Sequence, residues 1–127
     1  MNRRPLLRTL CGAAVALMVG CLSPTLPLPP PDEPSQIEPA GTAGMWEIQG
    51  NCIPGANVLI RNERTGVITG VQDRGNTGRY VVEIAAVECD PATVFELSDD
   101  IVTAGTSFLV REVINGVPQR ECGDAGQ

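Results

Sequence analysis

The residues with the widest chemical scope in this 127-residue chain are its five cysteines, Cys11, Cys21, Cys52, Cys89 and Cys122. Thiols form disulfides in an oxidising compartment, and an odd number leaves one of them unpaired. The chain contains no histidine, the commonest general base and metal ligand in proteins. It also lacks CxxC, GxSxG, GxGxxG and Walker-type motifs. We therefore predict no catalytic residue, no metal site and no cofactor.

Two loops carry carboxylates that could suit a hard cation such as calcium. Asp99 and Asp100 are adjacent, and Asp73 precedes Asn76 in a glycine-rich stretch. Asp and Asn side chains also bond their own backbone in turns, and we favour that interpretation at both places.

Trp46 and Tyr80 could offer aromatic faces to a sugar ring, and both are candidate ligand contacts. The other aromatic residues are Phe95 and Phe108. Large side chains usually belong to the core of a small domain, and we favour the core for Trp46. Exposure of either ring on a flat face would favour sugar binding instead.

The N-terminus has the features of a secretory signal peptide. Arg3, Arg4 and Arg8 precede the apolar run 10–19, which is shorter than the about 20 residues of a membrane span. The stretch Leu17-Met18-Val19-Gly20-Cys21 resembles the lipobox of bacterial lipoproteins. The resemblance implies cleavage between Gly20 and Cys21 and lipidation of Cys21, which would anchor the protein to a membrane. The alternative is an ordinary signal peptide that is cut elsewhere.

Residues 21–44 are expected to form a disordered tether. The segment from Ser23 to Ala43 is rich in proline and poor in large apolar residues, and such a composition favours extended polyproline II over a packed fold. Leu22 follows the cysteine. By resemblance to the sorting rule of Gram-negative lipoproteins, this residue favours the outer membrane.

The chain from Cys21 onward has six arginines against fifteen acidic residues, and therefore a formal charge of −9. It has no basic cluster and no lysine. Such a surface argues against nucleic acid as a partner.

Six short stretches with strand patterns predict an all-β fold: 45–50, 56–62, 67–73, 79–85, 93–99 and 107–113. In the fourth, Tyr80, Val82 and Ile84 alternate with the residues Arg79, Val81 and Glu83. Turn residues such as Pro54-Gly55 separate the stretches. Strands at this spacing are typical of a sandwich or small barrel.

Several motifs resemble the bacterial Ig-like and carboxypeptidase-regulatory-like β-sandwich families. They are Gly50, Pro54-Gly55-Ala56, Val58 to Asn62, Asp73 with Gly78, and Tyr80-Val81-Val82. The resemblance covers about residues 45–113. It implies a small Ig-like β-sandwich of six to seven antiparallel strands and says little about activity.

The expected strand order also predicts the disulfide. Alternating strand directions place Cys52 and Cys89 at opposite ends of the sandwich, about 20 Å apart, whereas bridged Cα atoms lie within about 7 Å. Asn115-Gly116 could turn the tail back, so that Cys122 approaches Cys89. We predict a Cys89–Cys122 bridge with Cys52 left as a thiol; the alternative is Cys52–Cys122.

The domains are therefore expected to be a signal peptide (1–20), a lipidated tether (21–44), the sandwich (45–122) and a tail (123–127). The expected function is a non-enzymatic envelope lipoprotein, facing the periplasm or the surface, whose domain has a structural or binding role. The alternatives are a carbohydrate-binding module and an inhibitor of an envelope enzyme that acts through 73–78 or 99–105. Its partner would be an envelope protein or a polysaccharide, and the oligomeric state is not predicted.

Overall fold

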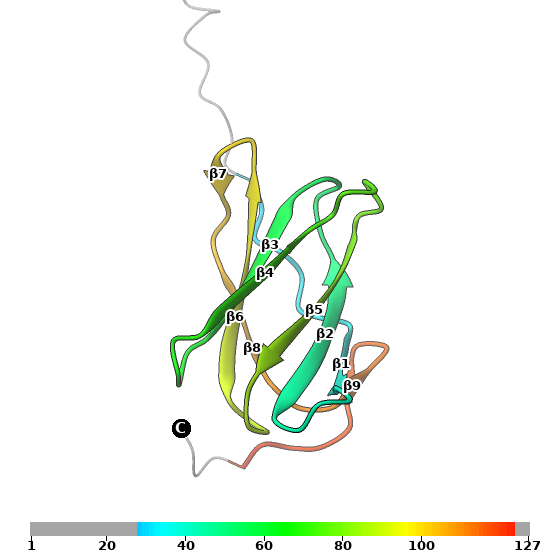
Figure 1. Cartoon of the computed structure of the whole chain (residues 1–127), viewed down its shortest axis with the longest axis vertical. Coiled ribbons are helices and arrows are strands. Elements are labelled where there is room, and N and C mark those ends of the chain that lie inside the picture. The colour runs from blue at the N-terminus through cyan, green and yellow to red at the C-terminus, as the bar shows by residue number, and fades with distance from the viewer. Residues whose placement is uncertain (1–27, 124–127) are drawn as a thin grey trace, which may run out of the picture.

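The computed structural model describes residues 28–123, which form an all-β sandwich of two antiparallel sheets (Figure 1). Sheet A has the order β10-β9-β1-β2-β5 and contains β1 (Gln36–Pro39), β2 (Met45–Asn51), β5 (Arg79–Ala85), β9 (Val113–Ile114) and β10 (Val117–Pro118). Sheet B has the order β4-β3-β6-β7, with β8 also paired to β6, and contains β3 (Asn57–Asn62), β4 (Ile68–Gln72), β6 (Pro91–Ser98), β7 (Ile101–Val102) and β8 (Thr106–Leu109). The predicted all-β sandwich is confirmed.

Alternation of side chains explains how these strands build one core. In β5, Tyr80, Val82 and Ile84 are buried while the residues between them are exposed. In β3 of the facing sheet, Val58 and Ile60 point into the same core. Fully burying an aliphatic side chain of this size contributes about 1.5–3 kcal/mol. A register shift by one residue would turn these side chains to water, so the core fixes the register.

The sandwich begins earlier than the sequence analysis predicts. Strand β1 lies inside the range 21–44 that is expected to be a tether, and it pairs with β2 over all four of its residues. Ile37 is 2% exposed and lies opposite Ile48. The tether was expected because the segment is rich in proline. The short stretch Gln36-Ile37-Glu38, with one apolar residue between two polar ones, nevertheless forms a strand. The structured region therefore begins before β1, not at Met45.

Residues 29–34 form a segment that we call the strap, which lies against the sandwich before β1 begins. Pro31 and Pro34 are buried, and the Thr106 hydroxyl at the start of β8 donates a hydrogen bond to the Pro31 carbonyl. The first residues of the strap share a cavity with Cys52 and Glu96. The chain therefore joins the sandwich at the end where β2 finishes, which we call the Cys52 end.

The opposite end carries the disulfide, and we call it the Cys89 end. Cys89 and Cys122 are bridged, with their Cα atoms 5.6 Å apart, as predicted. Cys52 is the free cysteine among residues 28–123. Because a cross-link restricts the unfolded chain, this bridge across 33 residues is expected to contribute about 2–4 kcal/mol. It also holds the tail against the turn that precedes β6.

Candidate functional site: a cleft beside strand β8

The stretch 107–113, which the sequence analysis predicts as one strand, is divided between the two sheets. β8 ends at Leu109 in sheet B, and β9 begins at Val113 in sheet A. Val110 is fully buried where the chain leaves β8. Since the chain then moves to the other sheet, β8 keeps β6 as its only strand partner among the described residues. Its other side is a free edge.

This free edge presents the backbone groups of Ser107 and Leu109. In an antiparallel pair, hydrogen-bonded residues alternate with residues whose N–H and C=O point away. The Val110 amide donates to the Asp90 carbonyl at 2.9 Å, so the alternate residues Leu109 and Ser107 point outward. Pro91 lies opposite Leu109 in a non-hydrogen-bonded pair, and its carbonyl accepts from the Glu63 amide on the other side of β6. Within residues 28–123, no turn or loop backbone group bonds to either residue.

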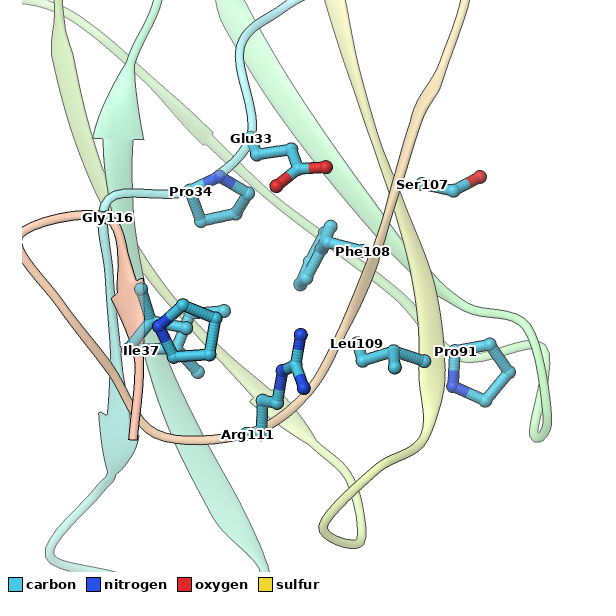
Figure 2. A pocket seen from close by; sticks show the side chains of 11 residues that line it. Glu33, Pro34, Ile37, Pro91, Ser107, Phe108, Leu109, Arg111 and Gly116 are labelled. Carbon is cyan, nitrogen blue, oxygen red and sulfur yellow. The ribbon is translucent and has the colours of Figure 1, made fainter. Parts of the chain in front are cut away.

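An open cleft of about 310 Å³ runs along this edge (Figure 2). The lining residues come from the strap, β1, the start of β6, β8 with the segment that follows it, and the β9–β10 hairpin: Glu33, Pro34, Ile37, Pro91, Ser107, Phe108, Leu109, Arg111, Val113, Gly116 and Pro118. Most of the walls are apolar. The volume lies at the lower end of the range of about 300–1,000 Å³ for ligand pockets.

Two opposite charges flank the cleft. Glu33 of the strap and Arg111 after β8 reach toward the Phe108 ring from opposite sides (Figure 2). Neither side chain belongs to any of the ion pairs between described residues. Arg111 donates one hydrogen bond, from Nη1 to the Arg120 carbonyl at 3.2 Å, which leaves other guanidinium N–H groups for a ligand. The cleft can therefore receive an apolar segment with charges at both ends.

The two aromatic candidates do not lie in this cleft. Tyr80 is 3% exposed, and its hydroxyl is buried without a hydrogen-bond partner in the described part. Burial, with Cys52 and Glu96 nearby, raises the pKa of Tyr80. Trp46 is half-buried and packs against the core, as we favoured. Sugar stacking on Tyr80 is therefore incompatible with its position, because its ring is covered by the sandwich.

The Cys52 end holds a second polar cluster. The Cys52 Sγ lies 3.9 Å from Oδ2 of Asp73. Burial, and then the negative charges of Asp73 and Glu96, raise the pKa of Cys52 to about 11, so the thiol is protonated at neutral pH. Glu96 is 2% exposed and accepts a hydrogen bond from the Ile53 amide at 3.2 Å. Burial raises the pKa of Glu96 as well. This cluster offers no thiolate nucleophile at neutral pH.

Asp73 acts as a turn residue. Its carboxylate accepts hydrogen bonds from the amides of Gly55, Thr77 and Gly78 at 3.2, 3.1 and 2.8 Å. Burial opposes its ionisation, but these bonds outweigh burial and lower the pKa of Asp73 to about 2. Asp99 and Asp100 have φ angles of 49° and 64° in the turn between β6 and β7. In residues 28–123, no three Cys, Asp or Glu side chains are grouped to hold a metal ion.

Gly20 and Cys21, the predicted cleavage and lipidation residues, lie outside the described residues. Between residues 28 and 123 the structure contains no helix that is long and apolar enough to span a membrane.

The cleft was not predicted from the sequence. Its charged residues, Glu33 and Arg111, are 78 positions apart and belong to segments expected to be a tether and a strand. Pro91 is a proline at a strand position, but its missing N–H lies on the side of β6 that faces β3, so it does not mark the free edge of β8. The position of the cleft depends on tertiary contacts between segments that are far apart in the sequence.

No protein-family model, curated protein or solved structure matches this chain. Its function must therefore be inferred from its own residues.

Proposed function

We propose that this protein is an exported, lipid-anchored binding domain of the cell envelope that performs no catalysis. The observation that carries the binding role is the open cleft beside β8, where unpaired backbone groups, apolar walls and two unpaired charges meet. A surface of this kind is suited to recognition. The absence of histidine from the sequence supports a role without acid–base catalysis.

The lipid anchor is supported by the sequence before the sandwich. The lipobox-like stretch ends at Cys21, only eight residues before the strap begins at Pro29. The strap meets the sandwich at the Cys52 end, so an anchor at Cys21 would turn the Cys89 end away from the membrane. The disulfide at that end suits an oxidising compartment outside the cytoplasm. Leu22 favours the outer membrane within this proposal.

Replacement of the predicted lipidated cysteine tests the anchor. Cys21→Ser should abolish incorporation of labelled fatty acid and leave the precursor uncleaved, because both steps need the thiol. Cys11→Ser is the matched control, since it removes another N-terminal thiol and should leave processing unchanged. Intact mass of the purified protein and its distribution between membrane and soluble fractions report the result. Normal processing and membrane retention of Cys21→Ser would exclude the lipoprotein interpretation.

A further inference from the structure

We propose that the cleft binds an extended peptide that adds as a strand to β8, with its C-terminal carboxylate beside Arg111 and a cationic group beside Glu33. The inference rests on the proposed binding role and names its ligand class. It does not depend on the lipid anchor, so peptide binding at the cleft and lipidation of Cys21 can fail separately.

The backbone of β8 supports strand addition. Ser107 and Leu109 present their N–H and C=O groups along the free edge, and the cleft lies directly beside them. A peptide strand at the usual spacing of about 4.8 Å could bond to both residues. In this mode of recognition, main-chain hydrogen bonds give the affinity and the pockets for alternate side chains give the specificity. The apolar residues Ile37, Phe108 and Val113 would receive those side chains.

The charges set the direction of the peptide. Glu33 lies near the first half of β8, where the strap is bonded to Thr106, and Arg111 lies two residues beyond the end of β8. A peptide that runs parallel to β8 therefore has its N-terminal end near Glu33 and its C-terminal end near Arg111 (Figure 2). An ammonium and a carboxylate at those ends complement both unpaired charges.

A single peptide fits this edge better than a second copy of the chain. The strap and the β9–β10 hairpin provide the far wall of the cleft through Pro34, Gly116 and Pro118. Those walls leave an opening with the volume of a small ligand pocket, whereas a second sandwich would have to bring its own edge strand between them. Two copies joined at β8 are therefore an outcome that would contradict the proposal.

The first test uses the peptide Lys-Thr-Val-Thr-Val with a free C-terminal carboxylate and the same peptide with a C-terminal amide. Calorimetric titration of the purified protein should show about fivefold weaker binding of the amide, as expected for loss of one partly exposed ion pair. In Arg111→Gln the two peptides should bind alike. Arg120→Gln, which changes an exposed arginine outside the cleft lining, should keep the fivefold difference. Equal binding of both peptides to the unchanged protein, or no binding of either, would overturn the proposal.

The second test examines the backbone. Ser107→Pro removes one outward N–H without touching the bonds between β6 and β8, and Ser107→Ala is the matched control that keeps it. We expect the affinity for the free-acid peptide to be at least tenfold lower with proline than with alanine at this position. On the unchanged protein, N-methylation of only one of two adjacent peptide residues should weaken binding, because alternate amides face β8.

Unchanged affinity in Ser107→Pro, or equal effects of both N-methylations, would overturn strand addition. Self-association that Ser107→Pro abolishes, measured by sedimentation without peptide, would assign the edge to a second copy and also overturn the proposal.

Discussion

At the scale of single residues, the Cys89 end is held by a buried polar network. Asp90 is buried and accepts hydrogen bonds from Arg64 Nε at 2.6 Å, from Asn62 Nδ2 at 3.0 Å and from the Val87 amide at 2.8 Å. The Arg64 bonds lower the pKa of Asp90 to about 2, against the opposing effect of burial. Asn62 has no exposed surface and therefore depends on these partners. The network therefore stabilises the turn that precedes β6, the strand with which β8 pairs.

The network predicts a dependence of stability on acid. Since the pKa of Asp90 is lower in the folded state than its unfolded value near 3.9, its contribution is complete above about pH 5 and is lost progressively as the pH falls toward 2. Asp90→Asn should flatten part of this pH dependence and lower the free energy of unfolding at pH 7 by about 2 kcal/mol. Urea denaturation at pH 7, 4 and 2.5 measures both effects.

Asp100→Asn is the control, because Asp100 is exposed in a turn and should change neither quantity. An unaltered pH dependence in Asp90→Asn would contradict the assigned role of this network.

At the scale of elements, the alternation of apolar and polar side chains predicted the long strands, whereas the proline-rich composition around β1 led to the expectation of a tether. In β5 every second side chain points into the core and the side chains between them face water, so the strand has a clear period of two. Strand β1 has one buried residue, Ile37, among prolines and acids, so no periodic signal separates it from a tether. The break between β8 and β9 was also missed, although the adjacent charged residues Arg111 and Glu112 interrupt the alternation between Val110 and Val113. Only the pairing partners show which sheet each strand joins.

The burial of Ile37 gives a direct test of β1. Ile37→Ala should lower the free energy of unfolding by about 2–5 kcal/mol, because it leaves a cavity between β1 and the core. Ile101→Ala removes the same atoms from a side chain that is 50% exposed, and it should change stability by at most about 0.5 kcal/mol. Equal small effects of the two substitutions, measured by urea denaturation, would place β1 outside the folded domain.

The outer face of sheet A carries a row of like charges. Glu47 lies opposite Glu38 of β1 on one side and opposite Glu83 of β5 on the other. Like charges directly opposite each other destabilise a sheet, and opposite charges stabilise it by about 0.2–1 kcal/mol per pair. Glu47→Lys should therefore raise the free energy of unfolding by about 0.5–2 kcal/mol at low salt.

Glu121→Lys makes the same change in net charge at an exposed tail position and serves as the control. Thermal melts in 20 mM and 500 mM salt should show a gain for Glu47→Lys alone, and that gain should shrink at high salt. A loss of stability in Glu47→Lys would mean that these carboxylates do not repel one another.

At the scale of the whole molecule, the two ends and the free edge have different roles. The strap meets the sandwich at the Cys52 end, the disulfide and the Asp90 network hold the Cys89 end, and the cleft lies along β8 between the two ends. The strand directions disfavoured a Cys52–Cys89 bridge, because opposite ends of a sandwich are too far apart to be bridged. The expected turn at Asn115-Gly116 then favoured Cys89–Cys122, the bridge that the structure contains, over Cys52–Cys122. The cleft could not be predicted in this way, since it depends on where the strap and the hairpin lie.

The free edge of β8 is the central claim, and amide hydrogen exchange of the purified protein measures it residue by residue. The amides of Phe108 and Val110, which face β6, should exchange slowly with the core. Those of Ser107 and Leu109, which face the cleft, should exchange many times faster, because no backbone group of the described chain protects them. Equal protection of all four amides would show that another strand already covers this edge, and would contradict the account.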